Sequence, residues 1–504
     1  MSESANAIKQ VKKRLIASYS FLIPAKKYTA DFDVTARNPL PAFLEISIQL
    51  LDTLNRISPY ELQSFLGIND NEREELLQQI ISTNLAFLNE NGDIEVTSGL
   101  NELKQSDGTI QLEGIERYTA SFYIDLASEH IQPRASNPSL AGFYELVSEE
   151  TLYNEFSAES IFQEDFNRFK LCTTIENIKK SKTRLYRINS CFYEKLVSFP
   201  VSVDIHSEWQ SDGHLKISSS LSGFSGDNLD LVVNSGILRY INTIFNNQTT
   251  QNDSLSVQDF CLRVQDNVLL NFEGAGGTFD IEKYLRERDK RRTGYGSPKT
   301  TGIIGSIYLP QNKGGFINWL SRTPSIQPIL WLPSSASYWG ASAYSRAFYE
   351  QVAELLTKKQ SSLSLVFPKA SSKQEAHECR QRYGGIADNL LSFQNAPPLD
   401  EMEILIVPGS PCWAMVQYHA RIAPAYGLRD ARIPIGYTTY DPERVKMLWE
   451  LMLRRTNFQD VKDVEQMTAG QVPDKILECL SSSHHWDEHS SLINSSSGEE
   501  DAVE

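Results

Sequence analysis

SPYELQSFLGINDNEREELLQQIISTNLAFLNENGDIEVTSGLNEL, residues 58–103, is the stretch that decides the fold of the N-terminal part of the chain. It opens with Ser58-Pro59-Tyr60-Glu61, a capping box with proline at the first helical position, which predicts a short helix ending at Gly67. A second helix is predicted from about Asn71 to Asn84, because one face of it is apolar. That face consists of Leu76, Leu77, Ile80 and Ile81.

A hairpin and a preceding helix complete this region. Asn91-Gly92 is a two-residue turn signal between the apolar runs 85–88 and 94–96, and it predicts a β-hairpin. Residues 39–56 have the pattern of an amphipathic helix. With these elements, residues from about 40 to 104 resemble a winged-helix module. The resemblance implies that the second helix of the helix-turn-helix would lie in the DNA major groove.

The charge of that second helix opposes DNA binding. Its start carries Asp70, Glu72, Glu74 and Glu75, with only Arg73 opposing them. A phosphate backbone repels such a surface, so the expected partner is a protein with a basic face. A winged-helix transcription factor, in which this helix reads bases, is an alternative.

The composition is that of an acidic, folded chain. Its 504 residues carry a net charge of −16, and the length allows about three domains at roughly 100–200 residues each. No apolar run approaches the ~20 residues that span a bilayer, and the first residues lack a signal-peptide pattern. Six scattered cysteines fit reduced thiols. We therefore expect a cytoplasmic protein that does not bind membranes.

The expected fold class is α+β multidomain: an N-terminal winged helix, a mixed helical and β middle, and a C-terminal α/β layered domain. The middle contains a predicted hairpin, because Ser211–His214 is a turn between two strand-like runs. The expected segments are a basic N-terminal arm at 1–38, the winged-helix domain at 39–104, the mixed region at 117–300, the α/β domain at 301–480, and a disordered acidic tail at 481–504.

The strongest basic segment is residues 283–299. Its glycines and proline predict a mobile loop after a short helix. Its cations could hold a phosphate backbone while Tyr295 stacks on a base, and the alternative is a solvated loop. The candidate nucleic-acid-binding residues are Arg286, Arg288, Lys290, Arg291, Arg292 and Lys299.

The C-terminal third alternates strand and helix patterns, which is typical of a layered α/β domain. Strands are predicted at 329–332, 362–367, 402–407, 414–419 and 433–437, and helices at 343–359, 371–382 and 442–455.

Within residues 325–455, a predicted strand runs into His419-Ala-Arg421 and is followed by Ile433-Pro-Ile-Gly436-Tyr-Thr-Thr. This order resembles the phospholipase D-like domains, a superfamily of phosphodiesterases and nucleases. The resemblance implies that His419 would attack phosphorus. It also implies that Arg421, in place of the family's lysine, would hold the phosphate oxygens. These two are the candidate catalytic residues.

The sequence departs from the family's motif at several positions. Tyr426 stands where the Asp is expected, and Gly436 is followed by Tyr437. The family also needs a second His-x-Lys, for which His214-Leu-Lys216 on the predicted hairpin is the candidate. A structural role for His419 at a strand end is the alternative interpretation.

These observations favour a non-enzymatic adaptor or accessory subunit of a bacterial multi-protein system, such as phage defence or DNA maintenance. It would dock a partner protein and contact DNA or RNA through the basic segment. A phospholipase D-like nuclease or phosphodiesterase is the main alternative. We expect no cofactor, because Gly274–Gly277 lacks the Gly-Lys-Ser/Thr of a phosphate-binding loop. We also expect no metal site, because the histidines at 484, 485 and 489 fall in the polar tail.

Overall fold

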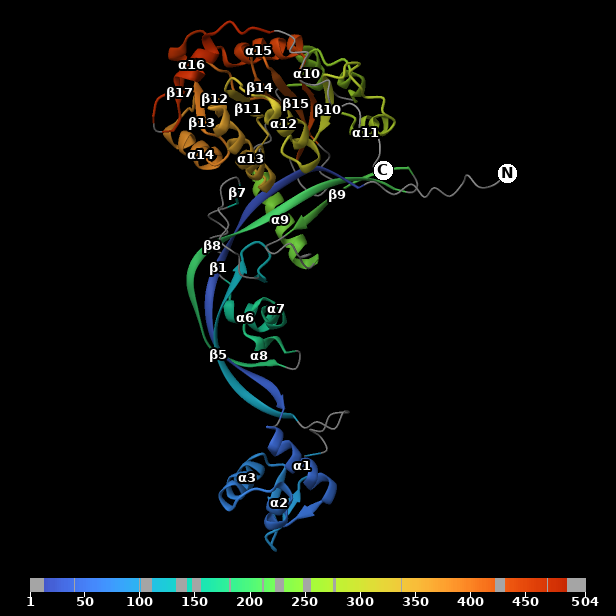
Figure 1. The fold of residues 1–504 in the computed structure, drawn as a ribbon, viewed down its shortest axis with the longest axis vertical. Coiled ribbons are helices and arrows are strands. Elements are labelled where there is room, and N and C mark those ends of the chain that lie inside the picture. Colours follow the sequence, from blue (N-terminus) through green and yellow to red (C-terminus); the bar gives the residue numbers. More distant parts are fainter. Residues whose placement is uncertain are drawn as a thin grey trace, which may run out of the picture. The chain divides into compact units, whose positions relative to one another are not determined.

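A computed structural model describes residues 13–39, 41–98, 100, 111–132, 143–146, 156–180, 183–210, 213–222, 231–247, 255–274, 278–336, 338–421, 431–468 and 470–486. The chain is a mixed α and β protein that divides into two compact units (Figure 1). One unit comprises residues 25–134 and 154–197, and the other comprises 1–24, 135–153 and 198–504. Two long strands, β1 (Arg14–Pro39) and β8 (Arg184–Trp209), contribute residues to both units.

The first unit contains a small lobe of three helices and a three-stranded sheet. Ser58 and Glu61 cap α2 reciprocally, and Gly67 ends it in the left-handed conformation, as the sequence predicts. The strands are in the order β2-β4-β3, and Asn91-Gly92 lies in the turn between β3 and β4. The elements are α1 (Ala42–Leu54), β2 (Arg56–Ile57), α2 (Pro59–Leu66), α3 (Asp70–Ser82), β3 (Ala86–Leu88) and β4 (Ile94–Val96).

The rest of this unit is a sheet with helices packed on one face. Strand β5 (Gln111–Asp125) pairs antiparallel with β1, from Ala25 opposite Asp125 to Pro39 opposite Gln111. Strand β8 is the other neighbour of β1, and β6 (Ile131–Gln132) pairs with β5. Phenylalanines from the sheet and helices form the core, among them Phe32, Phe122, Phe162 and Phe169. The helices are α6 (Ala158–Glu164), α7 (Phe166–Cys172) and α8 (Glu176–Lys179).

The basic arm expected at residues 1–38 is, from Arg14 onward, the strand β1, and residues 1–12 lie outside the described residues. The reason for the strand is visible in the burial pattern. Between Ile16 and Ile23 nearly every side chain is buried, as in a strand covered on both faces. From Tyr28 to Val34 the buried apolar residues alternate, which is the period of a strand with one face on a core. The mixed helical and β region expected at 117–300 begins within strand β5.

The second unit contains an eight-stranded mixed sheet in the order β10-β16-β15-β14-β11-β12-β13-β17. Strands β11, β12 and β13 are parallel, and the remaining pairs are antiparallel. The strands are β10 (Thr300–Ile304), β11 (Ile329–Leu332), β12 (Leu363–Pro368), β13 (Asn389–Phe393), β14 (Met402–Val407), β15 (Trp413–Arg421), β16 (Arg432–Thr439) and β17 (Val464–Gln466). Each predicted C-terminal strand is confirmed to within two residues.

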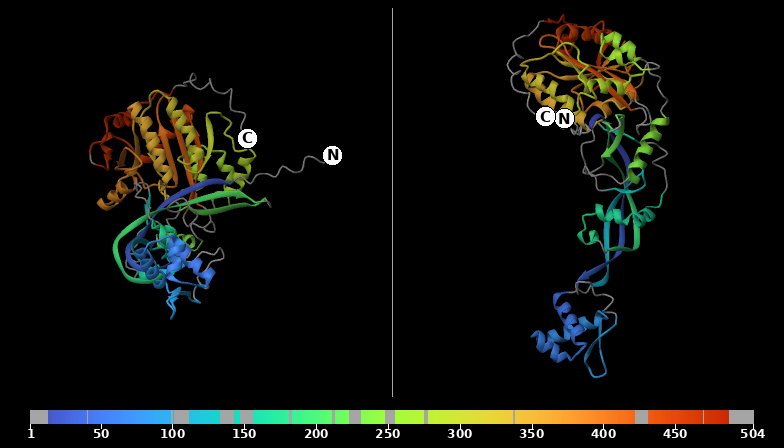
Figure 2. Two further views of the ribbon diagram at one scale, coloured as in Figure 1. Left: turned by 60° about the horizontal axis from the view of Figure 1, so that its bottom comes forward. Right: turned by 90° about the vertical axis from the view of Figure 1, so that its right-hand side faces the viewer.

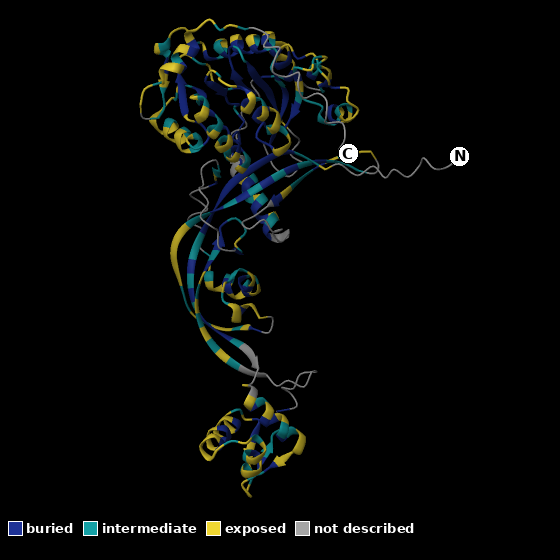
Figure 3. Ribbon diagram, in the orientation of Figure 1, coloured by how far each residue is buried: buried dark blue, intermediate teal, exposed yellow. Residues whose placement is uncertain are grey.

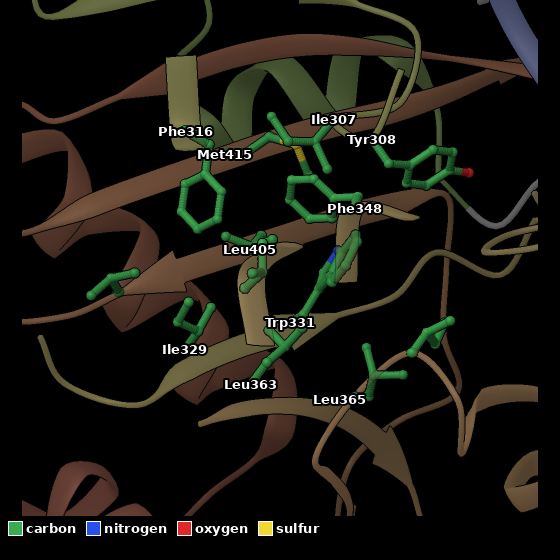
Figure 4. Close-up of a cluster of buried hydrophobic side chains, with 14 of the residues drawn as sticks. Ile307, Tyr308, Phe316, Ile329, Trp331, Phe348, Leu363, Leu365, Leu405 and Met415 are labelled. Carbon is green, nitrogen blue, oxygen red and sulfur yellow. The ribbon is translucent and has the colours of Figure 1, made fainter. Parts of the chain in front are cut away.

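Helices cover both faces of this sheet (Figure 2). Helices α12 (Pro310–Arg322) and α13 (Ala343–Lys359) pack on one face, where their aromatic residues meet Trp331, Leu405 and Met415 (Figure 4). Helices α10 (Val257–Val264) and α15 (Pro442–Thr456) contact β15, and α15 also contacts β14. The strands between the layers are almost wholly buried (Figure 3). This arrangement places the Glu403 side chain of β14 in a low-dielectric interior.

Further elements surround this sheet. Strand β9 (Leu215–Ser222) pairs with Ser202–Trp209 of β8, which confirms the predicted hairpin, and β7 (Tyr144–Glu145) pairs with β1. The other helices are α9 (Leu231–Asn247), the 3-10 turns η1 (Leu269–Phe272) and η4 (Val461–Asp463), α11 (Ile281–Asp289), α14 (Lys373–Tyr383) and α16 (Asp474–Ser481).

The structure also extends into the tail that the sequence assigns to disorder. His484 is half-buried, its ring stacks edge-on against Trp449, and Nε2 lies 2.9 Å from the Cys479 carbonyl oxygen. Residues 487–504, which include Asp487 and His489, lie outside the described residues. None of the helices in the described ranges combines the length and the apolar character that crossing a bilayer requires.

Candidate functional site

His419 occupies a buried position on β15, opposite Pro434 of β16. Its ring nitrogen Nε2 lies 2.5 Å from Oε2 of Glu403 on the neighbouring strand β14. The second carboxylate oxygen of Glu403 accepts a hydrogen bond of 2.8 Å from Trp331 Nε1 on β11. Both members of the histidine–glutamate pair are almost fully buried, with side-chain exposures of 5% and 1%. The imidazole is therefore fixed by a chain of three side chains on three adjacent strands.

The space around His419 is too small for a substrate. A cavity of about 10 Å³ lies beside it, which is room for about one water molecule. Tyr19, Tyr338 and Arg432 are among the residues that line it. The Tyr19 hydroxyl donates to the Arg432 carbonyl oxygen and accepts from the Arg432 amide. A phosphodiester could not reach the imidazole in this arrangement.

The other residues of the phospholipase D-like motif do not join His419. Arg421 is exposed at the last position of β15, and His214 is exposed beside the β8–β9 turn. Neither lines the cavity next to His419. Tyr426 lies outside the described residues.

Sequence reasoning missed Glu403 as the partner of His419. The signal was a single carboxylate within the apolar run Met402–Val407, which forms a strand buried at every position. A carboxylate in such a strand requires a hydrogen-bonding partner, because an isolated buried charge is costly. The partner lies 16 residues away in the adjacent strand.

The candidate nucleic-acid-binding residues fall into two groups. Arg286 and Arg288 lie on α11, where Arg286 pairs with Glu282 and contacts the Trp209 ring. Arg288 donates to the Gly302 carbonyl oxygen at 3.1 Å, so it supports the fold. Lys290, Arg291 and Arg292 follow the helix and are all exposed. Glu287 pairs with both Lys290 and Arg292, which offsets part of their charge.

Tyr295 does not serve as an open stacking platform. Its hydroxyl donates to Asp266 at 2.8 Å, and its ring lies against Tyr437 and the Arg444 guanidinium. Burial, reinforced by the neighbouring Asp266, raises the pKa of Tyr295 well above its usual value. These contacts disfavour stacking of the ring on a base, which stays a prediction. Lys299, at the end of the segment, is half-buried.

The small lobe of the first unit carries a concentrated negative charge. Residues 40–100 contain ten Asp and Glu residues, two arginines and no lysine. One of the arginines, Arg73, is buried: its guanidinium lies 4.6 Å from the centre of the Tyr60 ring and pairs with Asp70 and Glu74. Asp70 and Glu74 keep 79% and 65% of their side-chain area exposed. The outer face of α3 is thus acidic, and Arg73 cannot read bases from it.

The same lobe exposes large apolar side chains. Phe43, Ile46 and Leu54 lie along one face of α1 and are about half exposed, at 48%, 49% and 50%. Phe65 on α2 is 67% exposed. The opposite face of α1 is buried in the lobe's core through Leu44, Ile48 and Leu51. Such exposed apolar groups on a small lobe are typical of protein-binding surfaces.

All six cysteines are free thiols, and each is buried or half-buried. Burial raises the pKa of Cys172 and Cys191 to about 11, and of the other four cysteines to about 12, so the thiols stay protonated at neutral pH. Within the described ranges, no group of three or more His, Cys, Asp or Glu residues could hold a metal ion. Residues 275–277 of the glycine cluster lie outside those ranges.

A scan against models of protein families matches none of them, and searches of curated proteins and of solved structures return no match either.

Proposed function

We propose that the chain is a non-enzymatic adaptor that docks a partner protein through its small acidic lobe, residues 41–98 and 100. The observation that carries the proposal is the inward position of Arg73, which leaves the outer face of α3 acidic. The lobe's order of helices and strands supports its assignment as a winged helix. A winged helix that bound DNA through this face would bring carboxylates toward phosphates, which is unfavourable.

The partner proposed for the lobe is a protein with a basic surface and an apolar centre. Carboxylates on α3 would pair with lysines and arginines of the partner and speed the encounter. The exposed side chains Phe43, Ile46 and Phe65 would supply the apolar contact area that gives such interfaces most of their affinity.

The α/β sheet serves as a scaffold in this proposal. The burial of His419 against Glu403 favours a structural role over phosphodiester hydrolysis, since a nucleophile has to reach phosphorus. Contact with DNA or RNA is assigned to the three consecutive exposed cations Lys290, Arg291 and Arg292. Arg286 is exposed too but lies against the Trp209 ring, and Arg288 donates to the fold.

Affinity capture tests the docking role. The tagged full chain is expressed in cells of its source, the captured proteins are identified by mass spectrometry, and each is then tagged for reciprocal capture. The variant Glu74→Lys/Glu75→Lys reverses charge on the outer face of α3. A matched control, Glu443→Lys/Glu450→Lys, makes the same change of net charge on exposed positions of α15. We expect the recovery of a specific partner to fall at least tenfold with the α3 variant and to stay at the wild-type level with the control.

Two outcomes would contradict the proposal. One is equal recovery of every captured protein by both folded variants. The other is phosphodiesterase activity in the purified chain that His419→Ala removes.

A further inference from the structure

A groove of about 640 Å³ lies in the first unit, between helices α6 and α7 and the start of strand β8. Its strand side consists of the consecutive residues Arg184–Ile188. Its helix side includes the N-cap Ser157 and Ser160, Gln163 and Glu164 of α6, together with Asn167 of α7.

The groove follows the backbone edge of β8. Successive side chains of a strand point to opposite faces of its sheet, so a surface that touches only one face meets alternate residues. Here five residues in a row line the groove, which is the lining expected along a strand edge, where the backbone N–H and C=O groups lie.

This edge of β8 is not used by the neighbouring described strand. Strand β1 lies on one side of β8, and on the other side β9 pairs only with Ser202–Trp209. The segment Arg184–Ile188 thus offers a strand edge with a polar helix facing it across the groove. A sheet edge of this kind can accept an added strand from another chain.

We infer that this groove binds an extended peptide segment of a partner protein, which adds to β8 as a further strand. Backbone hydrogen bonds to the edge would supply the affinity. Five strand residues at about 3.3 Å each span about 16 Å, so the groove takes roughly five peptide residues. The site is separate from the acidic lobe, and the inference goes beyond the adaptor role proposed above.

The charges on the helix side specify the peptide's chemistry. Glu159 and Glu164 of α6 are exposed and line the groove, while the serine, glutamine and asparagine side chains around them are neutral. On the strand side, Arg187 is already paired with Asp33, and Arg184, at the first position of β8, is an exposed cation that also lines the groove. The peptide therefore carries a lysine or arginine on the side that faces α6, and its opposite side lies along Tyr186, which is 59% exposed.

A displayed library of random 12-residue peptides, panned on the immobilised full chain, tests the inference. Selected sequences are then synthesised and titrated by fluorescence anisotropy. The variant Ser160→Trp fills the groove from its helix side. The matched control Leu171→Trp adds an indole to α7 at a residue that is 85% exposed and does not line the groove. Far-UV circular dichroism establishes that both variants fold, and Asn167→Trp is a second, independent block.

We expect the selected peptides to be enriched in lysine or arginine. Their affinity should be at least tenfold lower for the variants Ser160→Trp and Asn167→Trp than for the wild type, and unchanged for Leu171→Trp. Only one edge of the peptide meets β8, so every second peptide N–H group bonds to it. N-methylation of one alternating set of peptide positions should therefore abolish binding, and N-methylation of the other set should leave it unchanged. Glu159→Lys/Glu164→Lys should weaken the basic peptides at least tenfold.

The inference is overturned if the library yields no sequence that binds above a scrambled control. It is also overturned if binders are insensitive to both tryptophan blocks, or if N-methylation in either register has no effect. Self-association of the full chain in ultracentrifugation that Ser160→Trp abolishes would assign the edge to a second copy of this chain instead. None of these results bears on the α3 variants, so failure here is distinguishable from failure of the adaptor proposal.

Discussion

His419 on β15 and Glu403 on β14 form a hydrogen-bonded pair, 2.5 Å between Nε2 and Oε2, inside a sheet that is covered on both faces. A buried pair of this kind is costly to break, because the remaining partner keeps its desolvation penalty without the interaction. The geometry thus gives His419 a role in the stability of the α/β sheet.

Replacing His419 by alanine is expected to destabilise the protein by about 3–5 kcal/mol, since it leaves Glu403 buried without its histidine. Trp331→Phe, which removes the other donor to Glu403 but keeps an aromatic ring, should cost about 1–3 kcal/mol. Urea unfolding followed by tryptophan fluorescence and circular dichroism measures both. A His419→Ala protein as stable as the wild type would show that the pair does not support the fold.

Asp33 gives the first unit a specific acid sensitivity. Hydrogen bonds from Arg187, and then from Arg117, lower the pKa of Asp33 to about 2. Because the ordinary pKa of an aspartate is near 3.9, the ionised pair stabilises the fold fully above about pH 5, and this contribution is lost as the pH falls toward 2. Thermal unfolding should therefore show a steeper fall in Tm between pH 5 and pH 2 for the wild type than for Asp33→Asn. Parallel pH profiles would contradict this.

Arg73 distinguishes the adaptor from the transcription-factor alternative. Its guanidinium contacts Tyr60 and three polar side chains of the lobe, Gln63, Asp70 and Glu74. Arg73→Ala is expected to lower the Tm of the lobe by several degrees and to leave DNA affinity unchanged. Arg56→Ala, at an arginine that is 59% exposed and pairs with Asp93 at 3.6 Å, is the control. An electrophoretic mobility shift that weakens with Arg73→Ala and not with Arg56→Ala would favour base reading.

Local signals in the sequence predict the local structure well. The capping box at Ser58, the Asn91-Gly92 turn and the apolar run Met402–Val407 each specify an element within a few residues of the chain. The lysines of β1 favour a basic arm, whereas the buried alternation of Tyr28, Ala30, Phe32 and Val34 is that of a strand.

The positions of the candidate site residues depend on partners distant in sequence, which no local pattern names. Glu403 is hydrogen-bonded to His419 on the adjacent strand, and Asp266 accepts a hydrogen bond from Tyr295, which is 29 residues away in the sequence. The groove beside β8 is lined by segments that precede and follow α8 in the sequence, so no local pattern predicts it either.

Tyr295→Phe tests whether the Tyr295 hydroxyl stabilises the fold through its hydrogen bond to Asp266. Asp266 is buried, and burial raises its pKa, while its carboxylate accepts from Tyr295 and from the Val268 and Leu269 amides. Losing the tyrosine donor should cost about 1–3 kcal/mol of stability. A second variant, Tyr295→Leu, removes the ring itself, and its affinity for a single-stranded oligonucleotide should equal that of the wild type if the ring meets no base. A large loss of oligonucleotide binding in a variant of unchanged stability would restore the stacking role.

The exposed cations after α11 should determine any salt dependence of nucleic-acid binding. Neutralising Lys290, Arg291 and Arg292 to alanine removes up to three phosphate contacts, so the slope of log K against log salt should flatten by up to about 2.7 for duplex DNA, at ~0.9 per contact. Because Glu287 already offsets part of this charge, we expect the slope to change by the amount that corresponds to about two phosphate contacts. Lys446→Ala/Lys462→Ala, which removes cations elsewhere on the same unit, is the control. Equal slopes for the wild type and the triple variant, measured by fluorescence anisotropy from 50 to 200 mM salt, would exclude this segment as the contact.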